Sequence, residues 1–376
     1  MVIASDDRLR RRGRTTAVPK KTRCKTVSDS ETLNDLFERG VRPFLAPPGR
    51  TAPLPALPAR FHGFADVYSV TIECRLGAQA GPVDFAWSQF REDFSVPPAL
   101  AHEEPWTSMA RFGECGQAGR SALPPIPSVV YEIDQDGERF GEVPAIFFNR
   151  IKGNASSVAA IYRSTNALLA RPSSPGTETM LRRVVDQMPP GSVVLCIGYM
   201  LSRPTAPVRF EMTQIEPYRS LPTYLRAIGW PGDEARVKAV LDSLPHLTRD
   251  FHAGLAFDVA DSVGPRLGLE FVFKDYTDHK AALAGALDDL IAAGLCTPGW
   301  REALARWTGD GPSQPDWMRA LLPDDSRHRR IVSHFKIVLD GPHLQAKGYV
   351  ECVPLRMLDP TRWNRPARRP VVMTEG

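Results

Sequence analysis

Charged side chains recur at alternate positions on several stretches of the chain that have the composition of β-strands. The clearest case starts at Arg266, and Glu270 and Lys274 follow it on the same face of the predicted strand. The opposite face consists of Leu267, Leu269, Phe271 and Phe273. Strict alternation of this kind indicates that one face packs against a core and the other carries polar groups. Cations gathered on such a face can bind a diphosphate, because phosphate oxygens accept charge-assisted hydrogen bonds.

If the polar faces of several strands point into one cavity, that cavity collects cations and acids together. The candidate diphosphate ligands are Arg209, Arg266, Lys274, Lys336 and Lys347. The other polar positions on these faces are Glu73, Arg75, Glu132, Glu211, Asp258, His334, Tyr349 and Glu351. Exclusion of water would strengthen their hold on an anion. The competing interpretation is a solvated sheet face, with cross-strand ion pairs worth only about 0.2–1 kcal/mol each.

The strands that must position these residues are predicted to come in five pairs. They cover residues 67–76 and 83–87, 129–134 and 143–149, 193–201 and 208–215, 255–259 and 266–273, and 332–339 and 344–352. The second pair flanks the turn residues Asp136-Gly137. Most pairs start roughly 60 residues apart, and a fixed period of this kind is typical of a repeat architecture.

Helical patterns fill the gaps from the second pair onward. The predicted helices cover residues 155–170, 177–188, 221–228, 233–244, 278–293 and 300–307, with Asp233 as a helix cap and Gly294 as a stop. Residues 92–127 are rich in proline and glycine, so the first unit lacks a clear helix pair. Because only one face of the predicted sheet is apolar, the helices must pack on that face.

Two α+β arrangements satisfy this pattern. One is an open antiparallel sheet with its polar face in solvent, and the other is a closed ten-stranded antiparallel β-barrel with helices outside and a polar interior. Closure removes the exposed edges that an open sheet must protect. A barrel of about ten strands is also too wide for aliphatic side chains to fill, so it can hold a ligand.

Basic residues cluster near both ends of the 376-residue chain, which carries a formal net charge of +4. We predict a basic, proline-rich, disordered or extended segment over residues 1–60, a single barrel domain over 61–356 and a basic tail over 357–376. The remaining body is mildly acidic, which argues against a dedicated nucleic-acid surface. We expect a cytoplasmic protein, because the sequence has no apolar stretch of about 18 residues and no signal-peptide core. Six scattered cysteines without a CxxC pair indicate neither zinc nor disulfides.

Over residues 64–352, the number and order of the units and the polar-face alternation resemble the aromatic prenyltransferases of the α-β-β-α barrel type. That family has ten antiparallel strands in five repeats, helices outside and a reaction chamber within. Lys347-Gly348-Tyr349 is similar to the Lys-x-Tyr of the family, in which the cation holds diphosphate and the aromatic ring shields an allylic cation. Arg209-Phe210-Glu211 resembles another chamber-facing pair of an arginine and a carboxylate.

The resemblance implies a transferase of secondary metabolism that moves a prenyl group from an allylic diphosphate to an aromatic or peptide acceptor. Such a transfer needs a diphosphate clamp, a base near the nucleophile and an aromatic wall that steadies a carbocation. Glu73 or Glu211 would be the base, with His334 behind them, and Tyr349 would be the wall. The allylic diphosphate is the expected co-substrate. No metal ligand set or other cofactor motif is indicated, and neither a membrane nor nucleic acid is an expected partner.

Two other classes of function remain open at this point. The first is a non-catalytic barrel that binds a peptide or small metabolite, in which the cations recognise carboxylates. The second is an open-sheet scaffold, or an accessory protein of a biosynthetic pathway, whose basic tails contact a partner. Motifs of other enzymes are missing: the sequence has no GxxxxGK[ST], GxSxG or HExxH, and no GxGxxG after a strand.

Overall fold

The computed structural model describes residues 32–45, 48–49, 54–77, 82–91, 94–117, 126–136, 139–149, 151, 153–201, 207–216, 218–274, 279–308 and 328–354. The basic N-terminal stretch up to residue 31 and the predicted tail over 357–376 lie outside these residues. No helix in the described part of the chain is long and apolar enough to cross a membrane.

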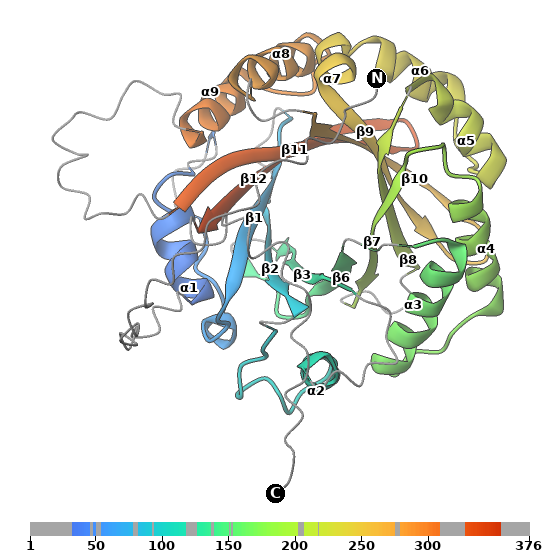
Figure 1. The fold of residues 1–376 in the computed structure, drawn as a ribbon. Helices are drawn as coiled ribbons and strands as arrows, with labels where there is room; N and C mark the ends of the chain where they lie inside the picture. Colours follow the sequence, from blue (N-terminus) through green and yellow to red (C-terminus); the bar gives the residue numbers. More distant parts are fainter. Residues whose placement is uncertain are drawn as a thin grey trace, which may run out of the picture. The chain divides into compact units, whose positions relative to one another are not determined.

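Ten strands of the described chain form a closed antiparallel barrel, in the order β1-β12-β11-β10-β9-β8-β7-β6-β3-β2 (Figure 1). They are β1 (Val67–Arg75), β2 (Asp84–Phe90), β3 (Ser128–Ile133), β6 (Ala145–Asn149), β7 (Val193–Met200), β8 (Val208–Ile215), β9 (Phe251–Val259), β10 (Val263–Phe273), β11 (His328–Asp340) and β12 (His343–Pro354). Closure comes from β1, which pairs with β2 on one side and with β12 on the other. The closed barrel confirms the predicted fold class and rules out the open sheet.

A second, two-stranded sheet extends the hairpin between β3 and β6. It consists of β4 (Gln135–Asp136) and β5 (Arg139–Phe140). The turn predicted at Asp136-Gly137 therefore coincides with the tip of this small hairpin, although Gly137 itself lies outside the described residues.

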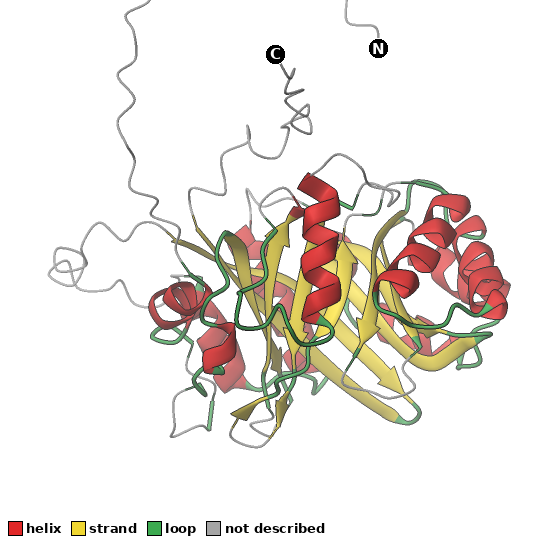
Figure 2. Ribbon diagram, turned by 90° about the horizontal axis from the view of Figure 1, so that it is seen from below, coloured by secondary structure: helices red, strands yellow, loops and turns green. Residues whose placement is uncertain are grey.

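Helices lie outside the barrel and cover the apolar face of its strands (Figure 2). They are α1 (Leu33–Leu36), the π-helix η1 (Phe37–Val41), the 3-10 helices η2 (Ala59–Phe61) and η4 (Tyr218–Ser220), α2 (Trp106–Gln117), α3 (Ala155–Leu168), α4 (Pro175–Asp186), α5 (Leu221–Ile228), α6 (Glu234–Asp242), α7 (Pro245–Asp250), α8 (His279–Ala292) and α9 (Pro298–Trp307). Asp233 caps α6 through the backbone N–H of Ala235, and Gly294 follows α8 with φ of 70°. Both residues therefore act as predicted.

The alternation in each strand decides which side chains face the helices. In β10, Leu267, Leu269 and Phe271 are at most 1% exposed and belong to the main hydrophobic cluster. Arg266, Gly268, Glu270 and Val272 alternate with them and line the interior of the barrel. The period-two pattern of the sequence thus separates a packed outer face from a polar inner face, as predicted.

The N-terminal segment differs from the prediction. Residues 32–45 were expected to belong to a disordered or extended stretch, but Leu33, Leu36 and Phe37 are at most 1% exposed and join the core. Among the described residues between β2 and β3, the first unit has one long helix, α2, in place of a helix pair (Figure 1). Because this part of the barrel has fewer helices of its own unit, the preceding segment contributes to its cover. The boundary predicted at residue 61 is therefore wrong.

We predict that Phe37→Ala lowers the free energy of unfolding by about 3–5 kcal/mol, the usual cost of emptying a buried phenylalanine site. The Phe37 ring makes edge contacts with Phe85 at 5.2 Å and Phe140 at 6.5 Å between centroids. Urea unfolding at a fixed pH measures the change. Val193→Ala, at a side chain that is 41% exposed, is the control and should change stability little. Equal, small effects of the two variants would mean that this segment is not part of the folded domain.

Candidate active site

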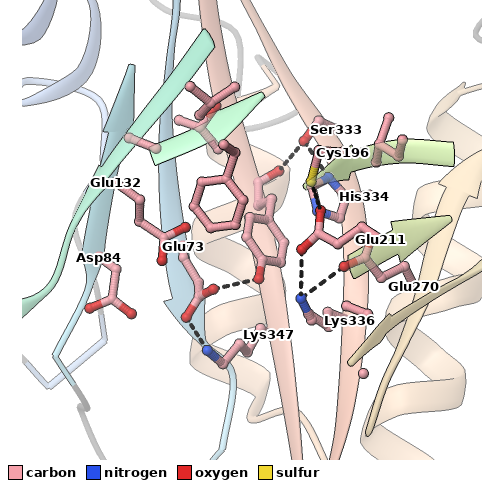
Figure 3. A pocket seen from close by; sticks show the side chains of 18 of the residues that line it. Glu73, Asp84, Glu132, Cys196, Glu211, Glu270, Ser333, His334, Lys336 and Lys347 are labelled. Carbon is pink, nitrogen blue, oxygen red and sulfur yellow. Dashed lines mark hydrogen bonds and ion pairs between the residues drawn. The ribbon is translucent and has the colours of Figure 1, made fainter. Parts of the chain in front are cut away.

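The interior of the barrel holds a cavity of about 680 Å³ that is lined by side chains from all ten strands. Eight of the nine predicted site residues line it: Glu73, Arg209, Glu211, Arg266, His334, Lys336, Lys347 and Tyr349. The prediction that these residues face one chamber is therefore confirmed, whereas their chemical roles stay predictions. Figure 3 shows many of their side chains converging from opposite walls.

Lys274 does not line this cavity, so the prediction that it joins the diphosphate ligands is wrong. The β10 strand ends at Phe273, and Lys274 therefore no longer follows the alternation that carries Glu270 inward. The Lys274 ammonium is bound to Glu216 at 2.8 Å and lies over the ring of Tyr218.

Glu73 is the centre of one cluster, because it accepts hydrogen bonds from the Lys347 ammonium and the Tyr349 hydroxyl (Figure 3). In the barrel register, Glu73 lies opposite Tyr349, and Arg75 lies opposite Lys347. Burial opposes ionisation of Glu73. The charge of Lys347 and the hydrogen bonds that Glu73 accepts outweigh burial and hold the pKa of Glu73 well below the usual range. Glu73 is therefore a carboxylate at any pH near neutrality.

His334 and Tyr349 form a stacked aromatic pair, with ring centroids 3.9 Å apart and planes 12° from parallel. A β-bulge positions the imidazole, because Val332 pairs with Val350 and His334 with Tyr349, which leaves Ser333 as an extra residue in β11. The Ser333 hydroxyl lies 2.9 Å from Nδ1 of His334. Burial lowers the pKa of His334 to about 4, so the ring is neutral at pH 7. The pair presents an uncharged π-surface to the chamber.

Lys336, which pairs with Lys347 in the β11–β12 ladder, binds two carboxylates (Figure 3). Its ammonium lies 2.8 Å from Glu270 and 3.6 Å from Glu211. Burial opposes the charged form of Lys336, but the two carboxylates outweigh it and raise its pKa. Burial and the charge of Glu270 raise the pKa of Glu211. Gly268 makes room for this lysine, because a Cβ at that position would lie 2.4 Å from Lys336 Cε.

The arginines lie toward the end of the barrel where the hairpins turn. Arg75 is the last residue of β1 and Arg209 the second of β8, so both are next to hairpin connections. Arg75 donates to Asp84 at 3.1 Å, and Nε of Arg209 donates to Asp258 at 2.7 Å. Arg266 lines the same chamber and lies 3.9 Å from Asp340. Each guanidinium has five N–H donors, so these contacts leave donors for a ligand.

Asp84 and Glu132 are two carboxyl groups with raised pKa values. Burial, followed by the charge of Glu73, raises the pKa of Asp84 to about 8. The same two causes, in the same order, raise the pKa of Glu132 to about 7. Asp84 pairs with Glu73 across the β1–β2 ladder, and Glu132 lies on the next strand. Figure 3 shows both acids on the wall beside Glu73. Glu73, Asp84 and Glu132 thus lie close together, and the negative charge of Glu73 disfavours ionisation of the other two.

Cys196 is a further chamber residue, and its thiol donates to Glu211 at 2.9 Å. Burial and this carboxylate raise the thiol pKa, so Cys196 is an unreactive thiol. Among the described residues, no group of three or more His, Cys, Asp or Glu side chains is placed to hold a metal ion.

Sequence reasoning missed Asp84, Ser333 and Cys196 as chamber residues. Asp84 begins a short strand in which Phe85 and Trp87 gave the signal of packing, and its inward position follows from the same alternation. Ser333 enters the chamber only through the bulge, which no sequence pattern announces. Two other aromatic residues, Tyr199 on β7 and Tyr162 on α3, do not line the chamber but are buried between the strands and the helices, where Tyr199 bonds to Thr165 of α3.

Comparison with solved structures finds similar folds at low sequence identity. One is 6-dimethylallyltryptophan synthase from Micromonospora olivasterospora, solved in complex with DMASPP and Trp, with a TM-score of 0.47, 16% identity, and 77% of this chain and 82% of that chain covered. Another is AnaPT from Neosartorya fischeri, with a TM-score of 0.47, 10% identity, and 85% and 86% of the two chains covered. No family model and no curated protein matches the sequence.

We predict that Glu132→Gln stabilises the protein relative to the wild type increasingly as the pH rises from 5 to about 7, and that the difference changes little between pH 7 and 9. The native pKa of Glu132 is about 7, above the value of an unfolded glutamate, so the native state binds more protons between these values. Wild-type stability from this group therefore falls as the pH rises toward 7, by at most about 1.4 kcal/mol per pH unit. Glutamine does not titrate, so the variant does not lose stability in this way. Urea unfolding of both proteins at pH 5, 7 and 9 measures it, and a difference that stays constant with pH would contradict the prediction.

Proposed function

We propose that the protein transfers a prenyl group from an allylic diphosphate to an aromatic or peptide acceptor within the barrel. The observation that carries the proposal is the convergence, in one enclosed cavity, of cations from five strands with a carboxylate and an aromatic pair. The cations are Arg75, Arg209, Arg266, Lys336 and Lys347. The allylic diphosphate is the only co-substrate in this proposal.

The diphosphate of the donor would lie toward the hairpin end, among Arg75, Arg209 and Lys347. Arg209 uses Nε for Asp258, and its terminal nitrogens have no partner within the described part of the chain. Phosphate oxygens would accept bonds from these donors. Such bonds become stronger as the reaction proceeds, because the departing diphosphate gains negative charge.

The allylic carbocation would lie against the Tyr349 and His334 pair. An aromatic face attracts a cation by its quadrupole, and the attraction increases where water is excluded. A neutral imidazole suits this position, because a protonated one would repel the cation. The low pKa of His334, about 4, keeps the ring uncharged during turnover at neutral pH.

The reaction balances with the residues present. The C–O bond of the allylic diphosphate breaks, and the diphosphate leaves with the electron pair. An aromatic carbon or heteroatom of the acceptor then donates an electron pair to the allylic carbon and forms the new bond. The proton that this atom loses goes to the carboxylate of Glu73. A carboxylate of low pKa is sufficient, because a proton on a cationic intermediate is strongly acidic.

A binding barrel without catalysis is the second candidate, and the charge of the lining favours it. Five cations line the described cavity, against seven carboxyl groups. These are Glu73, Asp84, Glu132, Asp134, Glu211, Glu270 and Glu351. In addition, each of the five cations has at least one carboxylate partner. A binding protein for a cationic metabolite would need no diphosphate site, so a test for diphosphate binding separates the two functions.

We predict that dimethylallyl or geranyl diphosphate raises the melting temperature of the protein, and that Lys347→Ala combined with Arg209→Ala abolishes the shift. The two combined substitutions remove hydrogen-bond donors on different strands of the proposed diphosphate site. Lys274→Ala is the matched control, because it also removes a cation but lies outside the chamber, and it should keep the full shift. A thermal-shift titration measures all three proteins. No shift with any allylic diphosphate would exclude the transferase and leave the binding barrel.

We predict that Tyr349→Phe keeps most of the transfer rate, whereas Tyr349→Leu lowers it. The phenylalanine retains the π-face against His334, but leucine removes a cation–π attraction of about 0.5–2 kcal/mol, which corresponds to roughly 2- to 30-fold in rate. Product formation from dimethylallyl diphosphate and a panel of phenols and indoles, followed by mass spectrometry, measures the rates. Equal rates of the two variants would remove the aromatic wall from the mechanism.

A further inference from the structure

Glu132 is a chamber carboxyl group without a partner. In the described part of the chain its side chain makes no hydrogen bond and no ion pair, although it lines the cavity. Its neighbours differ in this respect, because Glu73 binds Lys347, Glu270 binds Lys336 and Asp84 binds Arg75. A carboxylate that faces a cavity without a counter-ion is costly unless a ligand supplies one.

Small and hydroxyl-bearing side chains surround the space next to Glu132. Ala86 pairs with Glu132 on β3 and with Thr71 on β1, so its methyl group lies between them on the wall of the chamber. Ser88 is two residues further along the same face of β2 and pairs with Ser69. All of these residues line the cavity.

The serine hydroxyls on this wall are also without partners. Ser69 is 1% exposed and Ser88 is 4% exposed, and neither side chain makes a hydrogen bond within the residues that the structure describes. Buried hydroxyl groups normally find a partner, so their position indicates a polar ligand or water. A carboxylate and hydroxyl oxygens are all acceptors, and a protonated amine has N–H donors for several of them.

The charges that face Glu132 come from three other strands and from the residue that follows β3. Glu73 on β1 and Asp134 after β3 favour a cation beside Glu132, whereas Lys347 on β12 and Lys336 on β11 oppose it. Both lysines are already bound to other carboxylates, Lys347 to Glu73 and Lys336 to Glu270. Each of the five cations of the lining has another carboxylate partner, so none of them pairs with Glu132 when Glu132 is ionised.

We infer that the acceptor carries a protonated amine, and that Glu132 binds this amine on the wall formed by β1, β2 and β3. The inference rests on the proposed function, because it assigns the acceptor of that reaction. The donor and the acceptor would then contact different side chains: the anionic donor Arg75, Arg209 and Lys347, and the ammonium group Glu132 beside Ala86.

The test uses three phenols of similar size and different charge, added to the protein without any diphosphate. They are tyramine, which is cationic, 4-ethylphenol, which is neutral, and 3-(4-hydroxyphenyl)propionic acid, which is anionic. Isothermal titration at pH 8, where Glu132 is mostly ionised, measures their affinities. Tyramine should bind about tenfold or more tightly than 4-ethylphenol, the usual gain of a charge-assisted hydrogen bond, and the acid should bind most weakly.

Two variants locate the amine. Glu132→Gln should reduce the affinity for tyramine to that for 4-ethylphenol and leave 4-ethylphenol unchanged. Ala86→Leu keeps the carboxylate but fills the space beside it, and it should weaken tyramine binding as well. Glu351→Gln is the matched control, because it removes a carboxylate from the same chamber on β12 and should keep the preference for tyramine. The melting temperature of each variant shows that it is folded.

The outcomes separate this inference from the proposed function. Equal affinities for tyramine and 4-ethylphenol, or a preference that survives Glu132→Gln, would overturn the amine site even if allylic diphosphates stabilise the protein. A preference for tyramine that depends on Glu132, in a protein that allylic diphosphates do not stabilise, would uphold the amine site and overturn the transferase.

Discussion

Closure of the barrel is the constraint on which the rest of the structure depends. Once β1 pairs with both β2 and β12, the polar faces of all ten strands surround one cavity instead of facing bulk water. Charges that would be cheap on an open sheet then lose hydration, so they must find partners. The ion pairs of Glu73 with Lys347 and of Lys336 with Glu270 meet this demand, and the shifted pKa values follow from it.

The sequence predicts the strands and their faces well, because a polar interior and an apolar exterior both leave a period of two. The inward positions of His334 and Lys336 follow from this period alone, whereas that of Ser333 depends on a bulge that makes it an extra residue. Lys274 was misplaced because the alternation of side chains does not indicate where a strand ends, and β10 ends at Phe273. Phe37 shows another limit, because contacts between segments far apart in the chain leave no local pattern. The raised pKa of Asp84 likewise depends on burial and on Glu73, its partner on the adjacent strand, and neither is visible in the local sequence.

The chamber is chemically asymmetric, and the asymmetry has a structural origin. Hairpin turns lie at one end of the barrel, and three arginines sit close to those turns on β1, β8 and β10. Asp84, the first residue of β2, binds Arg75 at this same end, whereas Ser69 and Ser88 lie further from the turn on β1 and β2. The wall of β1 and β2 therefore changes along its length, from charged groups near the turns to the two serines.

The ion pair of Glu73 with Lys347 links donor binding to base strength in the proposed reaction. In the free protein, Lys347 holds the pKa of Glu73 well below its usual range, which makes this carboxylate a poor base. A diphosphate that draws the Lys347 ammonium toward itself would weaken that hold, and burial would then raise the pKa of Glu73. The carboxylate would thus become a stronger base only when the donor is bound. The same exchange explains how a lysine that is already paired can still bind the diphosphate, because each bond lost to Glu73 is replaced by one to a phosphate oxygen.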